Sequence, residues 1–464
     1  MNTLAWRTHP NSSVKYTHGL NHFLVSNFPD PFRKPAKPVR IESKGDVFKG
    51  HLYVVTFPAI VHSSNSGLVI KILQTTHEGF FPKVRATYLG QLPIKEIHLR
   101  DEKIKHALIA SVSKSPLGAR GRFIVFTHLC TVQKFLIIQT AFIGDVVLAT
   151  VLVEKLHAYF PEAQIDFLVR KGNEALLEHH PYLNEVLVWD KKKHKQRNLW
   201  KVLRLVRKKK YDKVINVQRF AATGILTAFS GAKETIGFDK NPFSSLFTRK
   251  ITHVVSENGP PMHEIERNLE LISDFTDAKP VRPRLYPCKP DEDKVLGYKH
   301  QPYITLSPAS VWFTKQFPAE KWISFLQRVP SNYHVYLLGA PADGALCEII
   351  IKSSEIAQIT NLSGKLTFLQ SAALMKDSVM NYVNDSAPMH FASAMNAPVT
   401  AIYCSTIPAF GFGPLSDKRF IVETTRKLDC RPCGLHGYKA CPKGHFKCAY
   451  EIEDAQLLKS IATD

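Results

Sequence analysis

The sequence predicts an α/β protein built from two doubly wound parallel-sheet domains in tandem. Short apolar runs typical of buried parallel strands alternate with longer amphipathic stretches typical of helices, and this alternation occurs twice along the chain. A segment with four prolines and many charges, residues 276–294, separates the two series and indicates an interdomain linker. Two Rossmann-like domains joined in this way enclose a cleft between the carboxyl ends of their strands.

The first of these domains is expected over residues 134–275. Strands are predicted at FLIIQ, IDFLV, VLVW and KVINVQ. Helices are predicted at VVLATVLVEKLHAYF, GNEALLEHH, RNLWKVLRLVRKKK, ATGILTAFS and HEIERNLELISDF. Strands that alternate with helices favour a parallel sheet, because a parallel crossover needs a connection about as long as a helix.

The second domain is expected over residues 295–464 and ends in a Cys-rich segment at 430–448. Its strands are predicted at YITLSPA, HVYLLGA, SVMNYVN and VTAIYC. Its helices are predicted at PAEKWISFLQRV, ALCEIIIKS, LTFLQSAALMK and APMHFASAMN.

Residues 1–133 differ from the rest of the chain and are left unassigned. They hold clustered prolines and roughly half of the net charge of +21, their apolar runs follow neither a helical nor a strand period, and they contain no motif. We interpret them as a misassigned upstream extension, an unrelated appendage or a disordered segment. Peptides from HLYVVTFPAIVHSSNSGLVIK in the natively expressed protein would refute the misassignment.

The composition excludes several classes of protein. The 464 residues are 44% hydrophobic, which excludes fibrous and wholly disordered chains. No run approaches the roughly 18 apolar residues of a spanning helix, and the first twenty residues lack the apolar core of a signal peptide, so a cytoplasmic protein is expected. The excess of 61 Lys and Arg over 40 Asp and Glu would suit nucleic acid. No zinc-finger, RRM-like or helix-turn-helix signature accompanies it, so no nucleic-acid partner is expected.

Asp145 is the first candidate for chemistry, since it comes after the first strand at the start of a helix. Gly144 is expected to let the chain turn sharply before it. Asp145 is either a helix cap that accepts backbone N–H groups, or a carboxylate at the cleft that takes a proton from an acceptor hydroxyl. The residues alone favour the cap. Hydride transfer loses most of its support because no GxGxxG motif is present.

The loop SPASVWFTKQFPAEKW in the second domain is a candidate phosphate site. Ser310, Thr314 and Lys315 offer two hydroxyls and a cation beside the helix that Pro318 opens. A lysine in a loop is commonly just solvated, and that alternative stays open.

The segment NYVNDSAPMHFASAMN is a second candidate anion site. Asp385 and Ser386 are expected to cap a helix whose first backbone N–H groups point into the cleft. His390 lies one turn later on the same face as Ser386. The commoner alternative for His390 is a core histidine whose hydrogen bonds are satisfied.

The Cys-rich segment is a candidate metal site. Four thiolates can close a tetrahedral zinc site, but the second half of this segment lacks a tight Cys-x2-Cys spacing. Reduced structural thiols or a facultative disulfide are the alternatives, and a cytoplasmic setting disfavours stable disulfides. The four candidates are Cys430, Cys433, Cys441 and Cys448.

The stretch KKKHKQRNLWKVLRLVRKKK predicts a basic amphipathic helix. Its apolar stripe consists of Leu199, Val202, Leu203 and Val206. Its other faces carry Lys201, Arg204, Arg207 and Lys208. This basic face is either simply solvated, or it rests on the anionic inner leaflet and guides a phosphorylated lipid acceptor.

Four motifs in this order resemble glycosyltransferase family 9, the ADP-heptose:lipopolysaccharide heptosyltransferases. They are FLIIQTAFIGDVVLAT, SPASVWFTKQFPAEKW, NDSAPMHFASAMNAPVTAIYCSTIPAFGFGPL and RPCGLHGYKACPKGHFKC, and the resemblance covers about residues 134–455. It implies a GT-B fold and an inverting, metal-independent transfer from ADP-heptose or a related ADP-sugar to a lipopolysaccharide inner-core acceptor. No cofactor is then required.

The resemblance also implies roles for particular residues. Asp145 corresponds to the base, and Lys315 to the lysine that contacts the donor phosphates. Asp385, Ser386 and His390 correspond to the residues that hold the nucleotide diphosphate. Ala387 stands where the family has glycine, so either this position needs no positive φ or the loop runs differently.

The expected partners are a nucleotide-sugar donor and a lipid-linked saccharide acceptor, at the cytoplasmic face of the inner membrane. Two other classes of function remain as alternatives. One is a GT-B sugar-nucleotide enzyme of another kind, such as an epimerase, which needs no lipid acceptor. The other is a basic nucleic-acid-binding protein.

Overall fold

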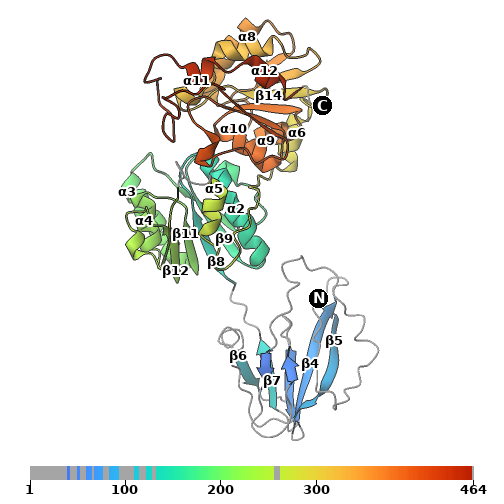
Figure 1. Cartoon of the computed structure of the whole chain (residues 1–464). Coiled ribbons are helices and arrows are strands. Elements are labelled where there is room, and N and C mark those ends of the chain that lie inside the picture. Colours follow the sequence, from blue (N-terminus) through green and yellow to red (C-terminus); the bar gives the residue numbers. More distant parts are fainter. Residues whose placement is uncertain are drawn as a thin grey trace. The chain divides into compact units, whose positions relative to one another are not determined.

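The chain forms two compact units, Met1–Thr131 and Val132–Asp464. The computed structural model describes residues 132–254 and 262–461, together with the backbone of strands between residues 39 and 127. In the first unit β1 (Val39–Ile41) pairs with β2 (Gly50–Leu52). An antiparallel sheet has the order β5-β4-β3-β7-β6 (Figure 1). Its strands are β3 (Ala59–Ser64), β4 (Gly67–Thr76), β5 (Lys83–Leu92), β6 (Ile109–Ser113) and β7 (Arg122–Thr127).

These strands lie within the segment that the sequence left unassigned. Its interpretation as a misassigned extension or an appendage stays a prediction. Residues 1–38 and the stretches between these strands lie outside the described residues.

The second unit begins with a doubly wound domain whose sheet has the order β10-β9-β8-β11-β12-β13, all parallel. Its strands are β8 (Lys134–Ile138), β9 (Gln164–Arg170), β10 (Glu185–Trp189), β11 (Lys213–Asn216), β12 (Glu234–Phe238) and β13 (Arg249–Ile251). Its helices are α2 (Ile143–Tyr159), α3 (Lys195–Lys209), α4 (Ala221–Ala228) and α5 (Glu264–Glu270). The prediction of a helix at GNEALLEHH is wrong, because only a single 3-10 turn forms there, at Glu174–Leu176.

The second domain repeats this strand order as β16-β15-β14-β17-β18-β19, again all parallel. Its strands are β14 (Tyr303–Ser307), β15 (His334–Leu337), β16 (Ile359–Asn361), β17 (Met380–Asn384), β18 (Val399–Tyr403) and β19 (Arg419–Glu423). Its helices are α6 (Lys289–Leu296), α7 (Ala319–Leu326), α8 (Gly344–Ser354), α9 (Phe368–Lys376), α10 (Ala387–Met395), α11 (Lys447–Tyr450) and α12 (Asp454–Leu458). Helix α6 begins inside the range 276–294 that was expected to be a linker.

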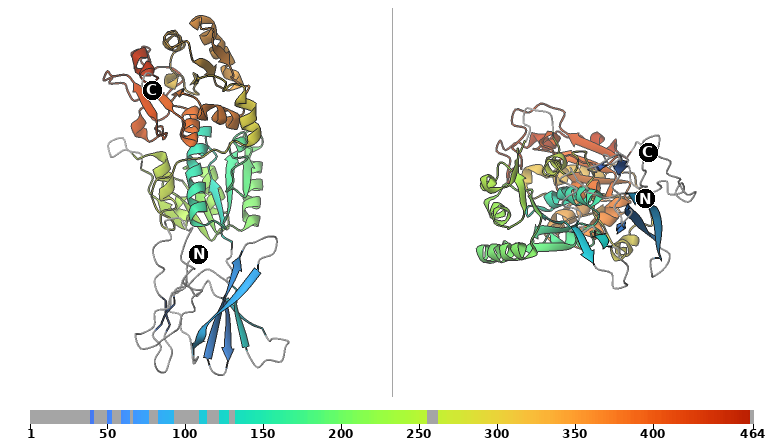
Figure 2. Two further views of the ribbon diagram at one scale, coloured as in Figure 1. Left: turned by 90° about the vertical axis from the view of Figure 1, so that its right-hand side faces the viewer. Right: turned by 90° about the horizontal axis from the view of Figure 1, so that it is seen from below.

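Helices cover both faces of each sheet in these two domains (Figures 1 and 2). Helices α2 and α5 lie on the side of the first sheet that faces α9 and α10 of the second domain (Figure 1). Every residue of α2 from Val146 to Val153 is buried, because the helix packs against its own sheet, α5 and α10. A helix that is apolar all round is typical of such a position.

A single hydrophobic core runs through this interface. It includes Phe135 and Val147 of the first domain and Met389 and Phe391 of the second. The two domains are therefore joined by apolar packing around the contact between α2 and α10. Within the described residues, no helix combines the length and apolar composition that a membrane span needs.

Candidate active site

The strand order of each sheet reverses at one point, between β8 and β11 in the first domain and between β14 and β17 in the second. Ligands of open α/β sheets bind at the carboxyl ends of the strands beside such a point. Asp145 comes after β8, Lys315 after β14 and Asp385 after β17. Three of the residues predicted from the sequence therefore lie at the two places where the fold favours a ligand.

Gly144 lies at a close approach of the two domains. A Cβ added to it would lie 2.7 Å from Cδ2 of His390 and 3.8 Å from Cα of Ala387. The expected sharp turn at Gly144 is wrong, because the residue belongs to the first turn of α2 and its φ is not positive. Glycine is instead required here because a side chain would collide with His390.

Asp145 occupies the third position of α2, and Phe142 is the N-cap residue. The Oδ2 atom of Asp145 accepts the backbone N–H of Phe142 at 3.1 Å, so the carboxylate does satisfy one backbone donor. Burial raises the pKa of this carboxyl, and the Phe142 N–H, Arg170 and Lys315 oppose that rise. A carboxylate with a raised pKa is suited to take up a proton near neutral pH.

In the second domain, Lys315 is held by Asp385. The Nζ atom of Lys315 lies 2.7 Å from Oδ2 of Asp385, and both side chains are largely buried. The hydroxyl of Thr406 donates to the same Oδ2 atom at 2.7 Å. A carboxylate repels a diphosphate, so this geometry favours Asp385 as the residue that orients Lys315 and not as a direct phosphate ligand.

Of the two hydroxyls predicted beside Lys315, that of Thr314 is engaged by the protein. The Oγ1 atom of Thr314 accepts the backbone N–H of Tyr438 at 2.7 Å and the hydroxyl of Ser405 at 3.0 Å. The backbone N–H of Ser310 donates to the side chain of Gln316 at 3.4 Å. Thr314 thus fixes the Cys-rich segment against the Lys315 loop.

Helix α10 supplies an uncapped N-terminus to the site. Ser386 is the N-cap residue, but its side chain caps nothing and lies 3.4 Å from the carbonyl oxygen of Asn384. The expectation that Asp385 and Ser386 cap this helix is therefore wrong, because Asp385 bonds Lys315 and Thr406 instead. An uncapped helix N-terminus next to a lysine favours an anion.

Ala387 and His390 lie in the first turns of the same helix. The φ of Ala387 is not positive, so the position does not need glycine, and the departure from the family pattern carries no strain. His390 is only 5% exposed, and its Nδ1 atom has no hydrogen-bond partner among the described residues. The alternative, that His390 is a core histidine whose hydrogen bonds are all satisfied, is therefore wrong. Burial, His263 and Lys315 lower the pKa of His390 to about 3, so its ring is neutral.

Helix α5 contributes residues to the site that the sequence did not reveal. Arg267 bonds Glu264 at 2.8 Å, and it donates to the carbonyl oxygen of Phe410 in the second domain at 3.1 Å. His263 contacts the carbonyl oxygen of Gly413 at 2.9 Å. Burial and the nearby Asp145 raise the pKa of Glu264. Nothing in the local sequence marks these residues, since their contacts cross between domains.

The Cys-rich segment covers the Lys315 loop. Gly437 has a φ of +73°, and a Cβ there would lie 2.8 Å from Oγ1 of Thr314. Cys433 donates to the carbonyl oxygen of Cys430 at 3.2 Å, and the Sγ atom of Cys430 lies 3.8 Å from Nε2 of His445. Among the described cysteines none is in a disulfide.

The four thiols of this segment do not share one environment. Cys448 lies in the hydrophobic core of the second domain, where burial raises its pKa to about 12. No three ligand atoms of residues 430–448, all of which the structure describes, lie within 4.8 Å of one another. Zinc binding by this segment stays a prediction.

A basic pocket of about 380 Å³ opens beside the start of α2. It is lined by Ile143, Arg170, Lys171, Gly172, Asn173, Lys191 and Lys192. Burial lowers the pKa of Lys191 to about 8, and its Nζ donates to the carbonyl oxygen of Thr140 at 2.7 Å. Arg170 and Lys191 come at and just after the ends of β9 and β10, so the rule for strand ends could have identified them from the sequence.

The apolar stripe of α3 is buried as predicted, and its basic residues are exposed. The 15 residues of α3 span about 22 Å. Lys209 at its end pairs with Asp166 and Glu185, which lie in the amino-terminal halves of β9 and β10. Arg207 and Lys208 therefore lie toward the amino-terminal ends of the strands, whereas Asp145 lies at their carboxyl ends.

The sequence profile of glycosyltransferase family 9 (heptosyltransferase) matches residues 199–436, more than half of the chain. Lipopolysaccharide heptosyltransferase 3 of Escherichia coli is 26% identical over 279 residues, which cover 57% of this chain and 82% of that protein. Lipopolysaccharide heptosyltransferase 2 of Escherichia coli (strain K12) is 24% identical over 315 residues, which cover 63% and 88%.

Solved structures show the same fold. The family 9 glycosyl transferase from Veillonella parvula DSM 2008 has a TM-score of 0.63 at 22% identity, covering 71% of this chain and 96% of that one. The ADP-heptose lipopolysaccharide heptosyltransferase II of E. coli has a TM-score of 0.59 at 21% identity, covering 71% and 98%. The expected GT-B architecture is confirmed. The chain belongs to glycosyltransferase family 9 and is a glycosyltransferase.

Proposed function

We propose that this enzyme transfers a heptose, or a related sugar, from an ADP-sugar to a lipopolysaccharide inner-core acceptor, with inversion at the anomeric carbon. The observation that carries the proposal is the position of Asp145 and Lys315, each of which follows the first strand of its domain beside the point where the strand order reverses. Lys315 is close enough to Asp145 to lower the pKa of its carboxyl. Asp145 can thus serve as the base for the acceptor while Lys315 binds the phosphates of the donor. The related heptosyltransferases suggest that the donor is an ADP-sugar and the acceptor a lipopolysaccharide core.

The reaction then needs one proton transfer and one displacement. Asp145 takes the proton of the acceptor hydroxyl, and the oxygen attacks the anomeric carbon from the face opposite the diphosphate. The bond between the anomeric carbon and the diphosphate oxygen breaks, and ADP leaves with its electron pair. Lys315 and the N-terminus of α10 stabilise the negative charge that develops on the leaving group. Asp385 keeps Lys315 in position.

Metal independence is part of the proposal. A lysine and a helix N-terminus together supply the positive charge that a divalent cation supplies in other transferases. The experiment incubates the purified protein with ADP-heptose and truncated lipopolysaccharide acceptors, with and without EDTA, and follows ADP release. We expect acceptor-dependent release that survives EDTA. Loss of activity in EDTA would refute metal independence alone.

The same assay separates the alternatives. No acceptor-dependent ADP release with any of several ADP-sugars would overturn the transferase assignment. Conversion of the sugar nucleotide without an acceptor would support an epimerase. Inversion is read from the anomeric configuration of the product by NMR, and retention would refute the single-displacement mechanism.

The acceptor side of the proposal rests on the basic pocket beside Asp145. Arg170 and Lys191 line it, and both lie next to the helix that carries the base. Anionic groups on an inner-core acceptor would be attracted there. We expect Arg170→Ala to raise the KM for the acceptor and to leave the KM for the donor unchanged. An equal rise in both would argue against an acceptor pocket.

Contact with the inner membrane is proposed for α3. Besides its basic residues, α3 exposes Trp200 and Leu205 at 55% and 40%. Each basic residue near an anionic surface contributes about 1 kcal/mol. The double variant Lys201→Glu, Arg204→Glu should bind phosphatidylglycerol-containing vesicles more weakly than the wild type in co-sedimentation. Lys352→Glu on α8 of the other domain is the control. Equal binding by all three proteins would refute this surface.

A further inference from the structure

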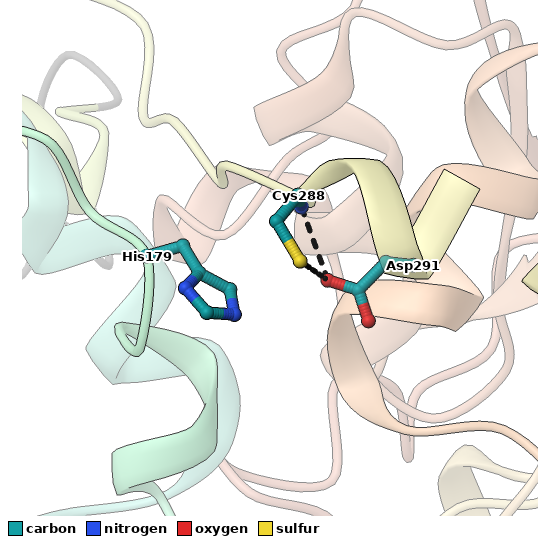
Figure 3. A group of neighbouring side chains, drawn as sticks. All are labelled: His179, Cys288 and Asp291. Carbon is teal, nitrogen blue, oxygen red and sulfur yellow. Dashed lines mark hydrogen bonds between the residues drawn. The ribbon is translucent and has the colours of Figure 1, made fainter. Parts of the chain in front are cut away.

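Three side chains with metal-binding atoms meet where the first domain contacts the start of α6. They are His179, Cys288 and Asp291, and one ligand atom from each lies within 4.8 Å of the other two. Figure 3 shows the imidazole, the thiol and the carboxylate pointing toward one another. His179 comes from the loop between β9 and β10, whereas Cys288 and Asp291 come from the first turn of α6.

Part of this arrangement is ordinary helix capping. The Oδ2 atom of Asp291 accepts the backbone N–H of Cys288 at 3.1 Å and its thiol at 3.2 Å. Capping explains why Asp291 lies near Cys288. It does not explain why a histidine from another domain faces the same thiol, so the position of His179 is the informative observation.

The surrounding residues hold the two sides in place. His180, next to His179, packs edge-on against the ring of Tyr286, with ring centroids 4.8 Å apart. Glu154 on α2 accepts the hydroxyl of Tyr286 at 2.8 Å and lies 3.4 Å from Nε2 of His180. Tyr286, two residues before Cys288, is thus held by Glu154, and the ring of His180 packs against it.

We propose that His179, Cys288 and Asp291 bind a zinc ion that links the two domains. Imidazole, thiolate and carboxylate are the ligands that zinc takes in proteins, and three of them leave a fourth position for water. In a tetrahedral site with bonds of about 2.0–2.3 Å, ligand atoms lie about 3.5 Å apart. The exposed ring of His179 can make up the difference of about 1 Å by rotating toward the thiol.

Binding replaces a proton by the metal. The thiol of Cys288 releases its proton to solvent, the thiolate binds zinc, and the hydrogen bond from the thiol to Asp291 gives way to a bond between zinc and a carboxylate oxygen. No oxidant or reductant takes part. Because α6 packs on α9 of the second domain while His179 belongs to the first, zinc would hold the two domains in one arrangement.

The test measures whether zinc protects Cys288 from alkylation. The full-length protein is stripped with a chelator, mixed with one equivalent of zinc or none, pulsed with iodoacetamide and digested with trypsin. Trypsin does not cut before proline, so Cys288 is recovered in the peptide LYPCKPDEDK with no other cysteine. Peptides from residues 430–448 report on the Cys-rich segment separately.

We expect zinc to slow alkylation of Cys288 in the wild type by at least tenfold, and to have little effect in His179→Ala. Loss of a residue that merely supports a metal ligand already lowers affinity by about 10- to 100-fold, so loss of a ligand should have at least that effect. His300→Ala, another exposed histidine, is the matched control and should keep full protection. Absence of protection in the wild type, or equal protection in His179→Ala, would overturn the proposal.

A second variant guards against a folding defect. Asp291→Asn keeps an oxygen that can accept the N–H of Cys288 and should retain α6, but it should lose at least tenfold in zinc affinity. Asp293→Asn, on the same helix, is its control. Unchanged zinc affinity in Asp291→Asn would remove the carboxylate from the site and so contradict the three-ligand proposal.

Discussion

The two domains of the enzyme have the same strand order but differ in the segment that connects their first strand to the next helix. In the first domain β8 leads almost directly into α2, and Asp145 lies in the first turn of that helix. In the second domain residues 308–318 form a loop between β14 and α7 that carries Lys315. The same strand order thus presents a carboxylate in the first domain and a cation in the second.

The shared fold therefore determines where the two residues lie, and the connecting segments determine which chemical groups they carry. Both residues lie at the carboxyl end of the first strand, where any doubly wound sheet can bind a ligand. A carboxylate with a raised pKa suits proton uptake, and a cation suits a phosphate. Replacing Asp145 should therefore impair the chemical step and leave donor binding intact, whereas replacing Lys315 should weaken donor binding.

Asp145→Asn should have the largest effect. The amide oxygen can still accept the N–H of Phe142, so α2 should form, but the carboxylate that we propose as the base is lost. We expect kcat to fall by about 10²- to 10⁴-fold while the Kd for the donor is unchanged. Asp343→Asn is the matched control, since Asp343 accepts the N–H of Ala340 in the same way at the start of another helix. Full activity of Asp145→Asn would leave Asp145 as a cap alone.

Lys315→Met should affect the other side of the cleft. Loss of a charged hydrogen bond of about 1.5–3 kcal/mol corresponds to roughly 10- to 100-fold weaker donor binding, measured by calorimetry with the ADP-sugar. Lys321→Met is the control, because Lys321 on α7 also contacts an aspartate, Asp454 on α12.

The pairing of Lys315 with Asp385 complicates that result, since the single variant leaves a buried carboxylate without its cation. The double variant Lys315→Met, Asp385→Asn should recover thermal stability but not donor affinity. Recovery of both would mean that Lys315 has a structural role only.

Gly144→Ala tests the close approach of the two domains. Alanine normally stabilises a helix by about 1 kcal/mol relative to glycine. Here its Cβ would lie 2.7 Å from His390, so we expect the free energy of unfolding to fall by about 1–3 kcal/mol. Gly297→Ala, where nothing lies within 4 Å of the added atom, should be neutral or stabilising. Urea denaturation measures both, and equal effects would refute the predicted collision.

The pH dependence of stability tests the burial of His390. Its pKa is lowered to about 3 in the folded chain, from about 6.5 when unfolded, so the unfolded chain binds more protons between these values. The contribution of His390 to stability is complete above pH 6.5 and is lost as the pH falls toward 3. Between pH 7 and 5 the loss is on the order of 2 kcal/mol.

His390→Gln should remove that part of the pH dependence, as measured by denaturant unfolding at several pH values. His300→Gln, at an exposed position, is the control. An unchanged slope in His390→Gln would show that the ring is not buried in its neutral form.

Much of the fold could be predicted because its signals are local. The run at Phe135–Ile138 is typical of a buried strand, and the stripe of α3 at Leu199 and Val206 is typical of a helix face, without knowledge of any other residue. Strands β12, β13, β16 and β19 were missed, and β13 and β16 are only three residues long, too short to show a period. A full helix was predicted where only the single turn Glu174–Leu176 forms. The residues there favour a helix, but Pro181 ends any helix shortly afterwards.

The candidate site could be predicted only in part. Asp145 and Lys315 were found because position after a strand is visible in the sequence. The pairing of Lys315 with Asp385 and the contact of Arg267 with Phe410 join residues far apart in the chain, so no spacing rule reveals them. The same holds for His179 and Cys288, whose approach depends on how the two domains pack.

The sequence by itself determined that this protein has two α/β domains in tandem with Asp145 and Lys315 at strand ends, because strand and helix periods and strand-end residues are properties of short segments. The glycosyltransferase activity was implied by the resemblance of its four motifs to family 9. Only the tertiary structure decided that Gly144 is needed for His390, that Asp385 orients Lys315 and that His390 is neutral. Those properties arise from burial and from charges on neighbouring elements, which exist only once segments far apart in the chain have packed together.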